Sequence, residues 1–107
     1  MRNYTAIFEL AARLRAADIP FEFHDRSVKE IGYVSYQIEY PCGSTGKKRR
    51  QCSVIEGDGS YGRFDDLLEI MGLLTAEEEE HDAVVGSLTV EEVFNRIQAD
   101  YRNGGWK

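Results

Sequence analysis

YVSYQIEY, residues 33–40, is the clearest strand pattern in the chain. Large apolar side chains occupy every second position of this segment, and mainly polar ones lie between them. Alternation with a period of two indicates a β-strand with one buried face and one face that meets water or a partner. A turn-rich segment, residues 41–46, follows it, and residues 51–56 are typical of the returning strand of a hairpin.

Patterns before this hairpin predict one helix and one short strand. Apolar residues repeat with helical spacing up to Ala17, and Asn3 is suited to cap the start of that helix. Residues 21–24 then alternate as a strand does, which places Glu22 and His24 on the same face.

Patterns after the hairpin predict three more helices. Apolar residues at positions i, i+3, i+4 and i+7 over residues 64–71 predict the first of them. Thr75 and Glu78 have the spacing of a capping box and begin a short acidic helix. Thr89 and Glu92 have the same spacing and begin the last helix.

The element order is therefore expected to be α-β-β-β-α-α-α, within a single domain of residues 1–107. This order predicts an α+β fold in which helices pack on one face of a three-stranded antiparallel sheet. The other face, with Tyr33, Ser35, Gln37 and Glu39, is then left partly open. Because edge strands of such a sheet are natural places for self-association, we expect a homodimer.

Composition restricts the class of protein. The chain has 107 residues, 42% of them hydrophobic, and a formal net charge of −6. That charge disfavours general binding to nucleic acid, in which Lys and Arg neutralise phosphates. The sequence shows no signal peptide and no apolar run long enough for a membrane span, so a cytoplasmic protein of a bacterial host cell is expected. Two cysteines, Cys42 and Cys52, flank the hairpin loop and are expected to be thiols, although a contact between them is plausible.

Nothing in the sequence indicates catalysis, a metal or a cofactor. Two cysteines cannot make a structural zinc site, and His24 and His81 would complete one only by a coincidence of folding. Both histidines precede an aspartate, but the rest of a metal-dependent phosphohydrolase motif is missing. No nucleophile motif is recognisable. We therefore expect no enzyme, no metal and no cofactor.

GDGSYG, residues 57–62, is the first candidate for a binding site. The spacing matches a dinucleotide fingerprint, but the parallel βαβ unit that this fingerprint requires is not expected here. A glycine turn before a helix can instead bring free N–H groups to an anion, or can simply be a tight turn. The ligand-binding residues of this turn would be Gly57, Gly59, Ser60, Tyr61, Gly62 and Arg63.

A basic run at the hairpin tip is the second candidate. It either is a solvated loop tip or contacts the phosphates of a nucleotide. It lies at the other end of strand 51–56 from the glycine turn, roughly 20 Å away, so only a dimer would bring the two to one small ligand. The run consists of Lys47, Lys48, Arg49 and Arg50.

An acidic run is the third candidate. It either is a solvated helical face or mimics the phosphates of nucleic acid and occupies a basic groove on a partner. The residues of this partner-binding surface would be Glu77, Glu78, Glu79, Glu80 and Asp82.

Four short segments resemble a group of bacterial prophage and mobile-element accessory proteins: CSVI (52–55), GSYG (59–62), LLEIMGLL (67–74) and VVGSLT (84–89). The resemblance covers roughly residues 33–102 and carries over no functional residues. It implies a role in neutralising host defence by binding. We expect first a non-catalytic protein that sequesters a phosphate-bearing nucleotide. The alternative is an acidic inhibitor of a defence nuclease such as a CRISPR effector, and the third possibility is a small hydrolase or nuclease.

Overall fold

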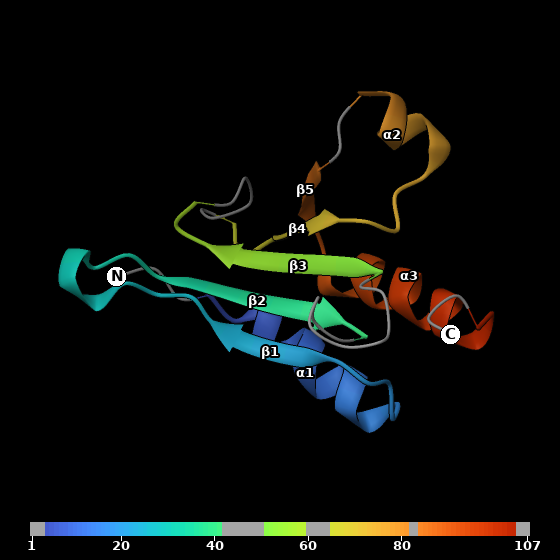
Figure 1. Cartoon of the computed structure of the whole chain (residues 1–107), viewed down its shortest axis with the longest axis horizontal. Helices are drawn as coiled ribbons and strands as arrows, with labels where there is room; N and C mark the ends of the chain where they lie inside the picture. The colour runs from blue at the N-terminus through green and yellow to red at the C-terminus, as the bar shows by residue number, and fades with distance from the viewer. Residues whose placement is uncertain (1–3, 42–50, 60–64, 82–83, 105–107) are drawn as a thin grey trace.

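The computed structural model describes residues 4–41, 51–59, 65–81 and 84–104 and shows an α+β fold (Figure 1). Its elements in chain order are α1 (Ala6–Ala16), β1 (Glu22–Asp25), the 3₁₀ turn η1 (Lys29–Ile31), β2 (Ser35–Tyr40), β3 (Cys52–Gly57), β4 (Leu68–Met71), α2 (Ala76–His81), β5 (Val84–Leu88) and α3 (Val90–Arg102).

The five strands form one antiparallel sheet in which each strand pairs with the next, in the order β1-β2-β3-β4-β5. Helices α1 and α3 contact each other and pack on the same face of the sheet, behind the strands in Figure 1. The core lies between these two layers. Its most deeply buried side chains are Ile7, Leu10, Leu14, Ile38, Tyr40, Val54, Leu68, Ile70, Val93 and Ile97.

The prediction of three strands is wrong, because the sheet contains β4 and β5 as well and the order is α-β-β-β-β-α-β-α. The helix predicted over residues 64–71 is wrong, because Leu68–Met71 of this segment form the strand β4. In that strand Leu68 and Ile70 are buried, whereas Met71 is 45% exposed. This short apolar run fits both a helical and a strand period, and pairing with β3 decides in favour of the strand.

Strand β5 was also missed. Its pairing with β4 shifts by one residue between Leu68 and Ile70, which is a β-bulge. Ser87 has a left-handed φ of 59° at this bulge. Strand β5 has only five residues, one of which is a glycine, and its register is irregular. Its sequence therefore shows little of the alternation that predicts a strand.

The predicted starts of α2 and α3 are confirmed, and that of α1 is not. Thr89 and Glu92 form a complete capping box at α3. Helix α1 begins later than predicted, with Thr5 as its N-cap residue, and Asn3 lies outside the described residues. In the described ranges, no helix combines the length and the apolar character that crossing a bilayer requires.

Candidate functional site

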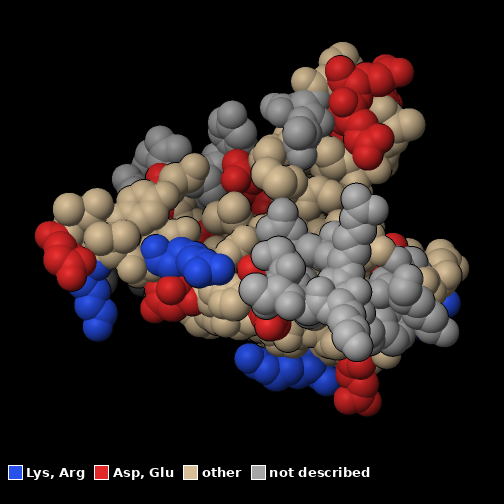
Figure 2. All heavy atoms as spheres, viewed as in Figure 1, with Lys and Arg blue, Asp and Glu red and all other residues tan. Residues whose placement is uncertain are grey.

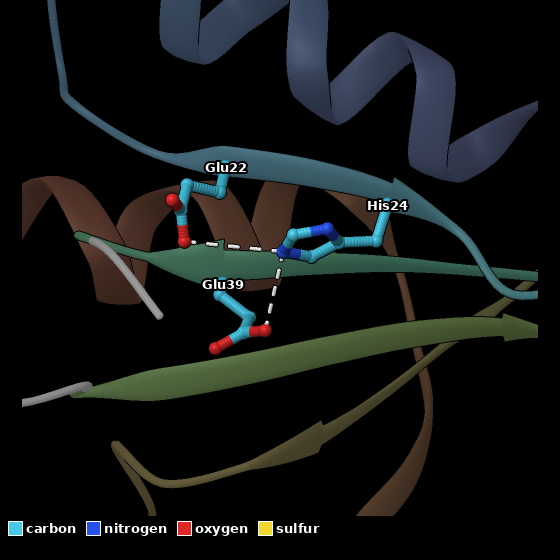
Figure 3. A group of neighbouring side chains, drawn as sticks. All are labelled: Glu22, His24 and Glu39. Carbon is cyan, nitrogen blue, oxygen red and sulfur yellow. Dashed lines mark ion pairs between the residues drawn. The ribbon is translucent and has the colours of Figure 1, made fainter. Parts of the chain in front are cut away.

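Strands β1 and β2 bring one histidine and two glutamates together on the sheet face opposite the helices (Figure 3). Glu22 pairs with Glu39 across the two strands, and His24 is the diagonal neighbour of Glu39. The His24 Nε2 atom is 3.2 Å from Glu39 Oε1 and 3.9 Å from Glu22 Oε2. One ligand atom from each of the three side chains lies within 4.8 Å of the others. We call these three residues the His–Glu cluster.

Burial differs across the His–Glu cluster. The Glu39 side chain is 8% exposed, that of His24 is 32% exposed and that of Glu22 is 46% exposed. His24 Nε2 is buried and makes no hydrogen bond, although two carboxylates face it. A charged carboxylate withdrawn from water needs an opposite charge or hydrogen bonds close by, so Glu39 marks this part of the sheet as a polar site.

Three further polar side chains support the cluster from the same face. Arg26 Nη2 is 3.6 Å from Glu39 Oε1, and Arg26 Nε donates to Gln37 Oε1 at 3.1 Å. Gln37 Nε2 in turn donates to Ser53 Oγ at 2.8 Å. The network thus runs from the edge strand β1 to β3. With two carboxylates and one guanidinium, it favours a cation as ligand over an anion.

The described part of the glycine turn, residues 57–59, packs closely against the segment that leads into β2. Gly57 belongs to β3 and pairs with Ser35, and a Cβ at residue 57 would lie 2.5 Å from the Val34 carbonyl oxygen. A Cβ at Gly59 would lie 2.2 Å from the Tyr33 hydroxyl. Both glycines therefore permit a close approach of neighbouring groups.

The expected anion site needed free amides and a following helix, and the helix predicted from residue 64 is not borne out in the described residues. The Asp58 N–H donates to the Val34 carbonyl at 2.8 Å. The Asp58 carboxylate accepts from Tyr4 Oη and from Val34 N. Among the described residues, the next helix or strand after β3 is the strand β4. The remaining residues proposed for this site lie outside the described residues: Ser60, Tyr61, Gly62 and Arg63.

The basic run also lies outside the described residues. Lys47, Lys48, Arg49 and Arg50 belong to the connection between β2 and β3, as does Cys42. Their predicted role in phosphate binding stays a prediction. Cys52 is buried in β3, and its thiol lies 3.8 Å from the Gly72 carbonyl oxygen.

The acidic run forms α2, which buries none of its residues. Figure 2 shows the acidic side chains gathered over α2, and Figure 1 shows that this helix stands away from the sheet. Glu77, Glu79 and Glu80 are exposed, and Asp82 lies outside the described residues. These three glutamates are therefore exposed, whereas Glu78 makes contacts within the chain, and the role of the acidic run in partner binding stays a prediction.

Glu78 fixes α2 to α3. Its carboxylate accepts two hydrogen bonds from Arg96, at 2.7 and 2.9 Å, and Arg96 also donates to the Leu73 carbonyl at 3.2 Å. The Thr75 hydroxyl accepts from Glu78 N, as the capping box predicts. The bonds from Arg96 are the main cause that lowers the pKa of Glu78 to about 2. A bidentate arginine pair of this kind gives α2 a defined orientation.

Two carboxyl groups, those of Glu56 and Asp66, accept hydrogen bonds from the backbone amides at the start of α1. Glu56 is fully buried in β3, and its Oε1 accepts from Ile7 N at 3.0 Å. Asp66 accepts from Thr5 N at 2.7 Å and from Ala6 N at 3.0 Å. Burial, and then the hydrogen bond with Asp66, raise the pKa of Glu56 to about 8. The amides that begin α1 are therefore already occupied by the chain itself.

The sequence predicted on which strand faces the residues of the His–Glu cluster lie, but it did not predict that the three side chains come together. The strand pattern placed Glu22 and His24 on one face of their strand, and it placed Glu39 on the polar face of the next one. The register that sets Glu22 opposite Glu39 came only from the structure. Searches for a matching family model, a similar curated protein and a similar solved structure found none.

Proposed function

We propose that the protein is a non-catalytic inhibitor that uses α2 to engage a cationic, nucleic-acid-binding groove on a defence nuclease in the bacterial cytoplasm. The observation that carries this proposal is the exposed acidic helix α2, fixed in place by the Glu78–Arg96 pair. A helix that buries none of its residues contributes little to the core, so its exposed glutamates at positions 77, 79 and 80 can contact a partner.

The charge density of α2 is close to that of nucleic acid over a short distance. Residues 77–80 span about 4.5 Å of helix axis at 1.5 Å per residue. Duplex DNA carries about one negative charge per 1.7 Å of its axis. Three exposed carboxylates in this span, at residues 77, 79 and 80, therefore match about three phosphates. The net charge of −6 adds long-range attraction toward a basic groove.

The fixed orientation of α2 also favours binding. Side chains on a disordered segment lose conformational entropy when they bind, and a preorganised surface avoids part of that loss. Arg96 provides this order from within the core-facing helix α3, where the pair with Glu78 raises the pKa of Arg96. The guanidinium therefore stays charged throughout the physiological range.

Neutralising the exposed glutamates of α2 tests this function. The triple variant Glu77→Gln, Glu79→Gln and Glu80→Gln is expected to weaken inhibition of DNA binding by purified RNA-guided and restriction nucleases at least about tenfold. Raising the salt concentration should weaken the wild-type protein in the same direction, because exposed charges are screened. Competition between the protein and labelled duplex DNA for each nuclease measures both effects.

A control variant with the same loss of charge changes exposed glutamates elsewhere: Glu9→Gln, Glu30→Gln and Glu91→Gln. It is expected to inhibit as the wild type does, within about twofold. Equal effects of the two triple variants would show that only net charge matters, and failure of the wild type to inhibit any nuclease in the panel would refute the proposal.

Sequestration of a phosphate-bearing nucleotide, the role expected first from the sequence, stays a prediction for the basic run. A thermal-shift screen with cyclic dinucleotides, cyclic trinucleotides and ADP-ribose tests it. A ligand at a hundredfold excess over its dissociation constant stabilises the folded state by about 2.7 kcal/mol. If no member of this library raises the melting temperature, nucleotide sequestration is eliminated.

A further inference from the structure

We infer that Glu22, His24 and Glu39 form a binding site for a divalent transition-metal ion, with Zn²⁺ as the ion of best fit. The inference depends on the sheet face opposite the helices and not on α2, so it is independent of the function proposed above. It assigns a role to three side chains that the packing of the core does not require.

The distances fit tetrahedral coordination. Zinc binds histidine nitrogen at about 2.0–2.1 Å and carboxylate oxygen at about 2.0–2.2 Å, so two ligand atoms of a tetrahedral site are roughly 3.3–3.5 Å apart. His24 Nε2 is 3.2 Å from Glu39 Oε1 and 3.9 Å from Glu22 Oε2. The ligand atoms of all three side chains lie within 4.8 Å of one another, so the half-exposed Glu22 side chain has to move inward to complete the geometry.

The imidazole provides the second observation. His24 Nε2 is buried, faces both carboxylates and makes no hydrogen bond. A neutral imidazole offers a lone pair at such a nitrogen, and histidine together with carboxylates is a common zinc ligand set. Figure 3 shows the Nε2 atom pointing between the two carboxylates, where a metal ion would lie.

Neighbouring side chains hold the most buried ligand in place. Arg26 Nη2 is 3.6 Å from Glu39 Oε1. Gln37 holds the Arg26 side chain in place, because Gln37 Oε1 accepts a hydrogen bond from Arg26 Nε. Polar partners of this kind orient the ligands of metal sites. Without a metal ion, the guanidinium also offsets part of the repulsion between the two carboxylates.

The ligand set selects among metal ions. Mg²⁺ and Ca²⁺ require six or more oxygen ligands, whereas this site offers one nitrogen and two carboxylates. Three protein ligands also leave a fourth position of a tetrahedral ion for water or another small ligand. The site therefore resembles an exchangeable zinc centre more than a closed structural one.

Direct metal titration of the chelator-treated protein tests the inference. Calorimetry with Zn²⁺ is expected to give one equivalent bound, with binding that weakens as the pH is lowered, because protons compete for the ligands. His24→Gln should lower the affinity at least about a hundredfold, since even the loss of a group that only supports a ligand costs 10–100-fold. Glu22→Gln, at a half-exposed position, should also weaken binding and serves if His24→Gln does not fold.

The chain supplies a matched control. His81→Gln removes the only other histidine, which is exposed on α2, and is expected to leave the affinity unchanged. Titration with Co²⁺ adds a spectroscopic test, because coordination by a cysteine would give a thiolate-to-metal absorption band and coordination by the His–Glu cluster would not.

Three results would overturn the inference. They are unchanged affinity in both His24→Gln and Glu22→Gln, a thiolate band in the cobalt spectrum, and no binding of either ion at millimolar concentration. In the last case the cluster would be a network of polar contacts within the chain that holds no metal ion.

Discussion

The Glu56→Gln variant is expected to match the stability of the wild type near pH 4.5 and to exceed it at pH 8. The pKa of Glu56 is raised from 4.5 to about 8 in the folded protein. Between these values the folded state holds a proton that the unfolded state has released, so the wild type loses stability as the pH rises. The slope is roughly 1–1.5 kcal/mol per pH unit, and the total loss is on the order of 4 kcal/mol.

Glutamine reproduces the protonated form of Glu56. Its amide oxygen can accept from Ile7 N, as Glu56 Oε1 does, and its amide nitrogen can donate toward Asp66 as a protonated carboxyl group would. Because glutamine does not ionise, the pH dependence that Glu56 causes should vanish. Urea unfolding of the two proteins at several pH values between 4.5 and 9 measures the difference directly. The exposed Glu9→Gln variant is the control and should keep the slope of the wild type.

Asp66 produces the opposite dependence at low pH. Burial raises its pKa, but hydrogen bonds from Glu56, Thr5 and Ala6 outweigh this effect and lower the pKa from 3.8 to about 2. Its contribution to stability is complete above pH 3.8 and is lost as the pH falls through 2. Equal pH slopes of the wild type and Glu56→Gln above pH 4.5 would contradict the raised pKa of Glu56.

Gly72→Ala is expected to cause the second large change, a loss of about 2–5 kcal/mol in the free energy of unfolding. Gly72 has φ +96°, and a Cβ there would lie 2.2 Å from the Gln51 carbonyl oxygen. The substitution therefore combines backbone strain of roughly 1–2 kcal/mol with overpacking of roughly 1–3 kcal/mol. Thermal and urea unfolding measure the loss.

Two other glycines separate the effect of backbone strain from that of overpacking. Gly32 has φ +66° but nothing within 4 Å of its Cβ position, so Gly32→Ala should show the strain alone. Gly57→Ala should show the overpacking alone, because its Cβ would meet the backbone of Val34 and Ser35. A loss in Gly72→Ala no larger than that in Gly32→Ala would mean that β3 can move aside.

Elements with a strong local signal were predicted correctly. The alternation of residues 33–40 gave β2 and the side of it that faces the core, and the capping box at Thr89 gave the start of α3. In both cases neighbouring residues determine the structure. The start of α1 was wrong because its cap comes from Asp66, which is distant in sequence.

The two missed strands depend on pairing. Leu68, Glu69, Ile70 and Met71 form a run in which helical and strand spacing coincide, and only contact with β3 selects the strand. The His–Glu cluster depends on pairing in the same way, because the cross-strand register decides which carboxylate His24 meets. Local sequence thus predicted the faces of the strands but not the neighbours across them.

The pairing of Met71 with Val84 has a consequence for how the protein could diversify. The chain leaves the sheet at the end of β4 and re-enters it at the adjacent position in β5. A helix exchanged between these two points would meet the same scaffold whatever its own charge. Only its anchor to Arg96 would need to be kept. Under the function proposed for α2, the sheet and the two core helices would serve as a constant platform for helices of different charge.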